Sequence, residues 1–233
     1  MANVNVTRLE EHAAWTKAGP VISHLPDNEI EVLEEQAMAT VGDPVPLGLW
    51  GFATGTWIAG TVIGGIFPSG TTADLAPVLI VFAGIAQFIA GLFAYRRAQA
   101  LPATAFCCFG AFNTTAGLLF LMQAAKLLAV DAPDLVLFGF LLESFCFIAL
   151  ALTIAAMEAN MAIVAVLGLL AIGYGCAGLP YLANSVNAGG WGIVGNIGGW
   201  FLCASAFVAY YTGMAMIVNS TRKRVVLPIW GRP

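Results

Sequence analysis

The sequence predicts an all-α membrane protein built as a bundle of six transmembrane helices. Of its 233 residues, 60% are hydrophobic and only 9% are charged. A water-soluble domain carries about 25% charged residues, so a chain of this composition could not cover its surface in water. The charges also avoid the long apolar runs, apart from Glu143. Such clustering of charge between apolar runs is typical of a protein that crosses the bilayer repeatedly.

Six apolar stretches follow Asp43. A hydrocarbon core of about 30 Å requires roughly 20 residues of helix, and proline, glycine or polar residues separate stretches of this length. The expected spans are 46–67, 75–95, 103–126, 135–157, 160–182 and 190–218. We therefore expect three regions, namely an acidic cytoplasmic segment over 1–43, a six-helix transmembrane domain over 44–219 and a basic cytoplasmic tail over 220–233.

The positive charges predict how the bundle is oriented. Arg96 and Arg97 follow the second expected span, and Arg222, Lys223 and Arg224 follow the sixth. Because even-numbered spans end on the same side, both clusters fall together, and the positive-inside rule places both termini in the cytoplasm. The expected location is the plasma membrane, crossed several times.

The acidic segment has a helical pattern of its own. Ile30, Leu33, Ala37 and Val41 fall near one face of a helix over residues 28–41. We interpret this stretch as a short helix at the membrane surface, and a partner-binding segment is the alternative. The net charge of −4 argues against nucleic acid as a partner.

Cysteine and histidine give no sign of a metal centre. The five cysteines all fall within expected spans without a C-x-x-C pair, and we interpret them as small apolar packing residues. His12 and His24 lie in the acidic segment without ligand-spaced partners. Since no catalytic set typical of soluble enzymes is present either, we expect no metal, no cofactor and no enzymatic activity.

Glycine faces within the expected spans each carry one larger or polar side chain. Phe52, Gln87 and Asn196 all lie between glycines at helical spacing. Small residues at this spacing let helices pack closely in lipid, and buried amides can simply bond across helices. The alternative is that these side chains line a solvated path through the bundle.

Glu143 is the only ionisable residue deep within an expected span. A charged carboxylate there is costly unless it is paired or solvated, which makes the residue a functional candidate. No lysine, arginine or histidine in another span could pair with it. The structural alternative is a protonated or hydrogen-bonded carboxyl that faces a neighbouring helix or subunit.

Residues 43–49 read Asp-Pro-Val-Pro-Leu-Gly-Leu. They resemble the Asn-Pro-Ala-Pro-Leu-Gly-Leu signature of the acetate uptake transporter family, the succinate-acetate permeases. The likeness continues through 84–87, 95–97, 170–173 and 226–229. It implies a six-helix protomer in a homo-hexameric ring, with a pathway in each protomer for acetate, succinate and related small carboxylates. Coupling to protons is also implied.

The resemblance further implies a hydrophobic constriction made by Phe52, Phe109 and Ile163. Two of these three residues differ from the family, because Phe109 lacks a tyrosine hydroxyl and Ile163 replaces a leucine. The constriction stays apolar, and an apolar neck can gate by dewetting. The missing hydroxyl removes a hydrogen-bond donor, which leaves a shifted substrate preference open.

A polar lining is expected around this constriction. The side chains that would orient the carboxylate are Thr56, Gln87, Asn113 and Asn196. Arg96 and Arg97 would raise the anion concentration at the cytoplasmic mouth. Three residues depart from the family pattern, namely Asp43, Asn113 and Glu143. These departures affect the inference about the substrate more than the inference about the fold.

Two other functions stay open. A small neutral-solute channel for urea, short amides or ammonia would also use six helices and an apolar neck. A non-transporting receptor or assembly subunit is suggested by the long acidic segment over 1–43.

Overall fold

The computed structural model describes residue 26 and residues 41–68, 71–128, 132–183 and 189–231, without the side chains of 132–135 and 189–191. The chain divides into two units, Met1–Gly42 and Asp43–Pro233. Almost all described residues belong to the second unit. The surface helix expected over 28–41 lies, apart from its last residue, outside the described residues.

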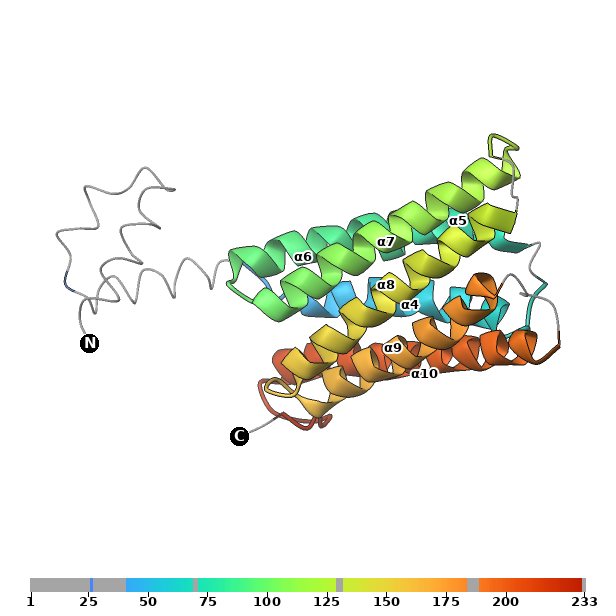
Figure 1. Ribbon diagram of the computed structural model, residues 1–233. Helices are drawn as coiled ribbons and strands as arrows, with labels where there is room; N and C mark the ends of the chain where they lie inside the picture. Colours follow the sequence, from blue (N-terminus) through green and yellow to red (C-terminus); the bar gives the residue numbers. More distant parts are fainter. Residues whose placement is uncertain (1–25, 27–40, 69–70, 129–131, 184–188, 232–233) are drawn as a thin grey trace. The chain divides into compact units, whose positions relative to one another are not determined.

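The second unit is a bundle of helices (Figure 1). In chain order the elements are α4 (Val45–Ile63), α5 (Thr72–Ile80), the π-helical turn η2 (Val81–Ala86), α6 (Gln87–Arg96), α7 (Ala100–Ala124), α8 (Ala132–Ala156), α9 (Met161–Leu182) and α10 (Gly189–Arg222). Within the described ranges there is no strand, so the all-α prediction is confirmed. The first and last residues of each expected span lie within four residues of the corresponding ends of a helix. For the second span, α5, η2 and α6 are counted together as one helix.

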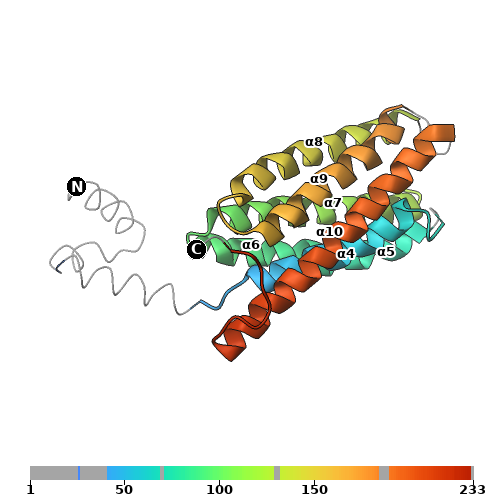
Figure 2. The same cartoon turned by 90° about the horizontal axis from the view of Figure 1, so that it is seen from below.

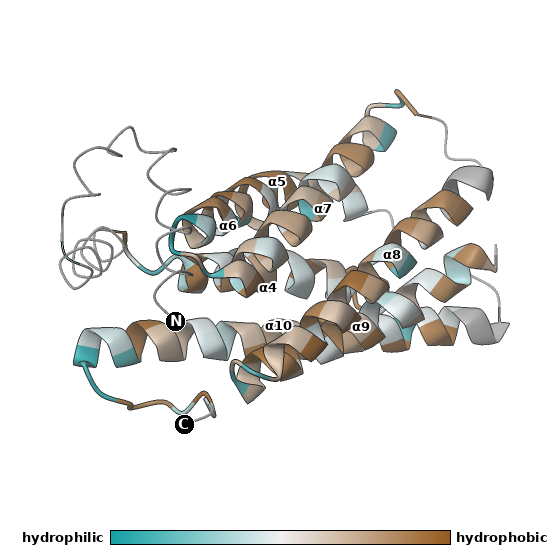
Figure 3. Cartoon of the chain, turned by 60° about the vertical axis from the view of Figure 1, so that its left-hand side comes forward, coloured by the Kyte–Doolittle hydropathy of each residue, from teal (hydrophilic) through white to brown (hydrophobic). Residues whose placement is uncertain are grey.

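Five helices within the described residues are long and apolar enough to cross a membrane. They are Thr72–Arg96, Ala100–Ala124, Val136–Ala156, Met161–Leu182 and Gly192–Arg222. Figure 3 shows that hydrophobic residues dominate the helices, whereas hydrophilic ones gather at the α6–α7 turn and the end of α10. The span expected over 46–67 is present as α4, but this helix is not among the five. Its 19 residues include several glycines and threonines on the buried face, and these lower its hydropathy.

Helix α4 packs against α10 and also against η2 and α6. Helix α9 lies between α8 and α10, while α7 packs against α5, η2 and α6. Figure 2 shows the same bundle from below, with α8 and α9 side by side and α10 crossing α4. The helices that follow α4 thus form two groups, and α4 contacts both.

Glycines provide the closest approaches between helices. A Cβ atom built on Gly199 of α10 would fall on the backbone of Gly64, just after α4. One built on Gly84 of η2 would fall on the side chain of Thr114 in α7. The interpretation of these glycine faces as packing surfaces is confirmed at both places.

The C-terminal tail folds back onto the bundle. Helix α10 continues to Arg222, beyond the boundary expected at 219/220. Asn219 Oδ1 accepts hydrogen bonds from the backbone N–H groups of residues 226 and 227, at 2.7 and 2.9 Å. The N–H of Met161, at the start of α9, donates to the carbonyl of Trp230 at 3.2 Å. The tail therefore lies at the end of the bundle where α9 begins.

Candidate functional site

Two cavities lie at opposite ends of the bundle. The first, of about 480 Å³, is lined by the end of α4, the start of α5, the ends of α7 and α9 and the start of α10. The second, of about 360 Å³, is lined by the start of α4, the α6–α7 turn, the start of α9 and the end of α10. We name them the Asn113 cavity and the Gln87 cavity, after the buried amide that lines each.

Four aromatic rings separate the cavities, and we call them the neck. Phe52 and Phe109 line the Gln87 cavity, whereas Phe112 and Tyr174 line the Asn113 cavity. The ring centroids of Phe52 and Phe109 are 6.0 Å apart, and those of Phe109 and Tyr174 are 6.4 Å apart. Phe145 of α8 packs behind Phe109 and Phe112. All four neck residues are at most 7% exposed, so the neck is buried.

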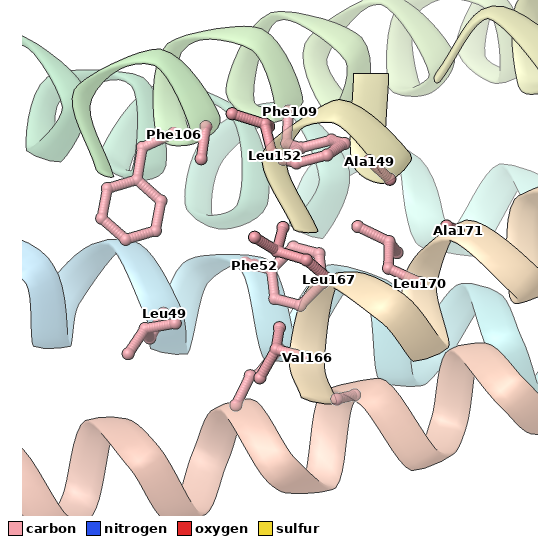
Figure 4. Close-up of a cluster of buried hydrophobic side chains, with 14 of the residues drawn as sticks. Leu49, Phe52, Phe106, Phe109, Ala149, Leu152, Val166, Leu167, Leu170 and Ala171 are labelled. Carbon is pink, nitrogen blue, oxygen red and sulfur yellow. The ribbon is translucent and has the colours of Figure 1, made fainter. Parts of the chain in front are cut away.

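Aliphatic side chains of α9 complete the neck. Figure 4 shows Phe52 of α4 next to Leu167 of α9, with Phe109 and Leu170 in the same buried cluster. Leu170 is fully buried. Ile163 lines the Gln87 cavity at the first turn of α9 and packs partly buried against this cluster. The structure thus brings Phe52 and Phe109 into contact and places Ile163 on the wall of the same cavity.

A buried amide pair runs beside the neck. Asn113 Nδ2 donates to Gln87 Oε1 and to the carbonyl of Ala83, both at 3.3 Å. Because a backbone carbonyl can only accept, this contact fixes the orientation of the Asn113 amide and, through it, that of Gln87. Gln87 is 0% exposed, and its Nε2 is buried without a hydrogen-bond partner. Gln87 Nε2 is therefore an uncommitted donor in a residue that lines the Gln87 cavity.

The π-helical turn η2 helps to build this pair. Ala83 belongs to η2, and the additional residue in a π-helical turn displaces carbonyls from the regular helical ladder. Pro77, one turn earlier in α5, lacks an N–H donor. The local sequence therefore permits an irregular helix at η2, where the carbonyl of Ala83 accepts the hydrogen bond from Asn113.

The remaining uncharged candidates share one cavity. Thr56 and Asn196 line the Asn113 cavity. Two residues that were not expected from the sequence, Gln99 and Asn160, line the Gln87 cavity. Asn160 Oδ1 caps α9 by accepting from the N–H of Ile163 at 2.9 Å, and Gln99 Oε1 is buried without a partner. The only available signal was that both are polar residues at or shortly before the start of an expected span.

The three charged candidates lie outside both cavities. Arg96 and Arg97 end α6, shortly before Gln99, and therefore lie at the Gln87-cavity end. Glu143 lies where α8 meets α9, since a Cβ atom on Gly178 would come within 2.5 Å of Glu143 Oε1. Among the residues described, no charged side chain lines either cavity.

Comparison with known proteins identifies the family. The model of the GPR1/FUN34/yaaH family matches residues 29–231. This chain belongs to that family. The resemblance carried by residues 43–49 and the later motifs is thereby confirmed.

Individual relatives are similar to this chain over most of their length. The succinate-acetate/proton symporter SatP of Escherichia coli is 27% identical over 189 residues, which are 81% of this chain and 95% of SatP. An uncharacterized protein of Methanothermobacter thermautotrophicus is 24% identical over 212 residues, 89% of this chain and 98% of the relative. A solved structure of the bacterial acetate channel SatP aligns with a TM-score of 0.72 at 26% identity, over 81% of this chain and 98% of that one. The family member described here is thus a multi-pass membrane protein with a channel fold.

Proposed function

We propose that this family member is a membrane channel or proton-coupled transporter for acetate, succinate and related small carboxylates. One observation carries the proposal: two cavities at opposite ends of the bundle meet at an apolar neck. Beside this neck lies the buried amide of Gln87, whose Nε2 has no hydrogen-bond partner. The proposal is supported by the relatives named as a succinate-acetate/proton symporter and as an acetate channel.

The chemistry of the lining suits a small carboxylic acid. Gln87 Nε2 can donate to a carboxyl oxygen, while the apolar walls accept an alkyl group. An apolar neck disfavours hydrated ions, because they would have to shed water there. A neutral acid crosses such an uncharged path at lower cost than a carboxylate does, and this difference supports coupling to protons.

The proposal includes α4 as the sixth transmembrane span. Its 19 residues at about 1.5 Å each give roughly 28 Å, close to the hydrocarbon thickness of about 30 Å. Residues 96–97 and 222–224 then lie together at the Gln87-cavity end. By the positive-inside rule this end and both termini face the cytoplasm of the plasma membrane. A homo-hexameric ring of such protomers is also part of the proposal, on the family resemblance.

Uptake of labelled acetate into liposomes tests the function. We expect saturable uptake by the full chain, and we expect Phe52→Ala to widen the neck and raise succinate uptake relative to acetate uptake. The control is Phe93→Ala on α6, because Phe93 is 41% exposed and lines neither cavity. Absence of saturable uptake, or an unchanged ratio in Phe52→Ala, would contradict the proposal.

A neutral-solute channel is the second candidate. It is favoured by the absence of charged side chains from the described lining of both cavities. Competition separates the two functions. Excess succinate should reduce acetate uptake if carboxylates are the substrates, whereas reduction by urea or acetamide alone would favour the neutral-solute channel.

A receptor or assembly subunit is tested by truncation. Deleting residues 1–40 should leave uptake intact if transport is the function of the helical unit. If the acidic segment serves partner binding instead, the deletion should abolish recovery of that partner, and the full chain should show no saturable uptake.

A further inference from the structure

Tyr174 is the one neck residue that carries a hydroxyl. It lies on α9 and is 5% exposed. Its ring stacks against that of Phe109 at an interplanar angle of 26° and meets the ring of Phe112 edge-on at 5.3 Å. Packing against two rings fixes the plane of the phenol. The neck itself therefore fixes the ring, and Tyr174 belongs to the lining of the Asn113 cavity.

The Asn113 amide has no donor left for a ligand on this side of the neck. Both N–H groups of the Asn113 amide are already used, by Ala83 and Gln87. The remaining Asn113 Oδ1 can only accept. Within the described part of the chain, the Tyr174 hydroxyl makes no hydrogen bond to a protein group. It is therefore free to donate to a solute that reaches the neck.

We propose that Tyr174 is a specificity-determining residue whose hydroxyl donates a hydrogen bond to the carboxyl group of a short-chain acid at the Asn113-cavity face of the neck. This inference rests on the proposed function and adds a residue to it. Asn113 Oδ1, in the lining of the same cavity, can accept from the O–H of a neutral acid. Donor and acceptor together match a carboxylic acid, whereas purely apolar solutes satisfy neither group.

The concentration dependence of acetate uptake into liposomes tests this proposal. Tyr174→Phe keeps the ring and both ring contacts but removes the hydroxyl. We expect the concentration for half-maximal uptake to rise about 3- to 10-fold, as for the loss of one hydrogen bond, with little change in maximal rate. Tyr95→Phe is the matched control, since Tyr95 is exposed, pairs with Thr104 and lines neither cavity. Its half-maximal concentration should equal that of the unmodified chain.

Rescue separates a hydroxyl effect from a packing effect. Phe112→Tyr in the Tyr174→Phe background returns a hydroxyl to an adjacent ring in the lining of the same cavity, and we expect it to reverse at least half of the rise in half-maximal concentration. A double variant no better than Tyr174→Phe would overturn the proposal. So would a half-maximal concentration unchanged in Tyr174→Phe, or one shifted by Thr56→Val instead. If the unmodified chain still shows saturable uptake in those cases, only the role of Tyr174 is contradicted and the proposed function stands. If the unmodified chain shows no saturable uptake, the proposed function and the role of Tyr174 are both contradicted.

Discussion

The amide of Gln87 is fully buried, yet only one of its two polar atoms has a hydrogen-bond partner. Its oxygen accepts from Asn113, and its nitrogen has no partner among the described residues. A buried polar group without a partner costs about 1–3 kcal/mol, and a carboxyl oxygen arriving in the Gln87 cavity would remove that cost. We therefore propose that Gln87 binds substrate and does not serve helix packing alone.

Replacing Gln87 tests this assignment. Gln87→Met keeps the length of the side chain but removes its donors, and hydrogen bonds to charged groups contribute about 1.5–3 kcal/mol. We expect the initial rate of acetate uptake, measured below saturation, to fall by about tenfold or more. Gln123→Met on α7 is the control, because Gln123 lines neither cavity. An unchanged rate in Gln87→Met would show that the amide serves packing only.

Glu143 is predicted to be structural. It lies against Gly178 at the α8–α9 contact and lines neither cavity. We expect Glu143→Gln to transport acetate with an unchanged dependence on pH, measured as uptake at a series of external pH values. Gly178→Val should lower thermal stability instead, because its side chain would displace the Glu143 carboxyl. Loss of the pH dependence in Glu143→Gln would place this carboxyl on a proton path.

At the scale of the elements, the α4–α10 contact depends on backbone approaching backbone. A Cβ atom on Gly199 would fall on Gly64 and come within 2.7 Å of the carbonyl of Gly60. Neither neighbour has a side chain that could move aside. This contact holds α4 in the bundle, and with α4 it holds Phe52 in the neck.

Gly199→Ala is therefore expected to destabilise the bundle. Forcing a methyl group into such a contact costs about 1–3 kcal/mol, which thermal unfolding in detergent would measure. Gly168→Ala on α9 is the control, because its new Cβ would meet only Thr153 at an ordinary 3.7 Å. Equal unfolding temperatures for the two variants would show that the α4–α10 contact accommodates a methyl group, which would contradict this prediction.

The second expected span illustrates the limit of hydropathy. Residues 75–95 read as one apolar helix, and in the structure Thr72–Arg96 is interrupted by η2. A π-helical turn changes the backbone ladder without changing composition, so an apolar run does not reveal it. Yet η2 supplies the Ala83 carbonyl that orients Asn113, and this detail decides which amide groups remain available.

At the scale of the whole molecule, the ring assembly is a prediction from family resemblance. We expect the purified chain in mild detergent to show particles with six-fold symmetry in electron micrographs and the mass of six chains by native mass spectrometry. A stable monomer that still transports acetate would contradict the ring and leave the pathway within each protomer intact.

The sequence by itself determined the membrane class, the helix positions to within four residues and the family, because composition, helical length and the 43–49 motif are all local properties of the chain. It also pointed to Phe52, Gln87 and Asn113. Only the tertiary structure decided which side chains face the cavities, because hydropathy cannot distinguish a residue that faces lipid from one that faces the pathway. Packing of α9 against the rest of the bundle brought Tyr174 onto Phe109, and packing of α8 on α9 left Glu143 outside both cavities.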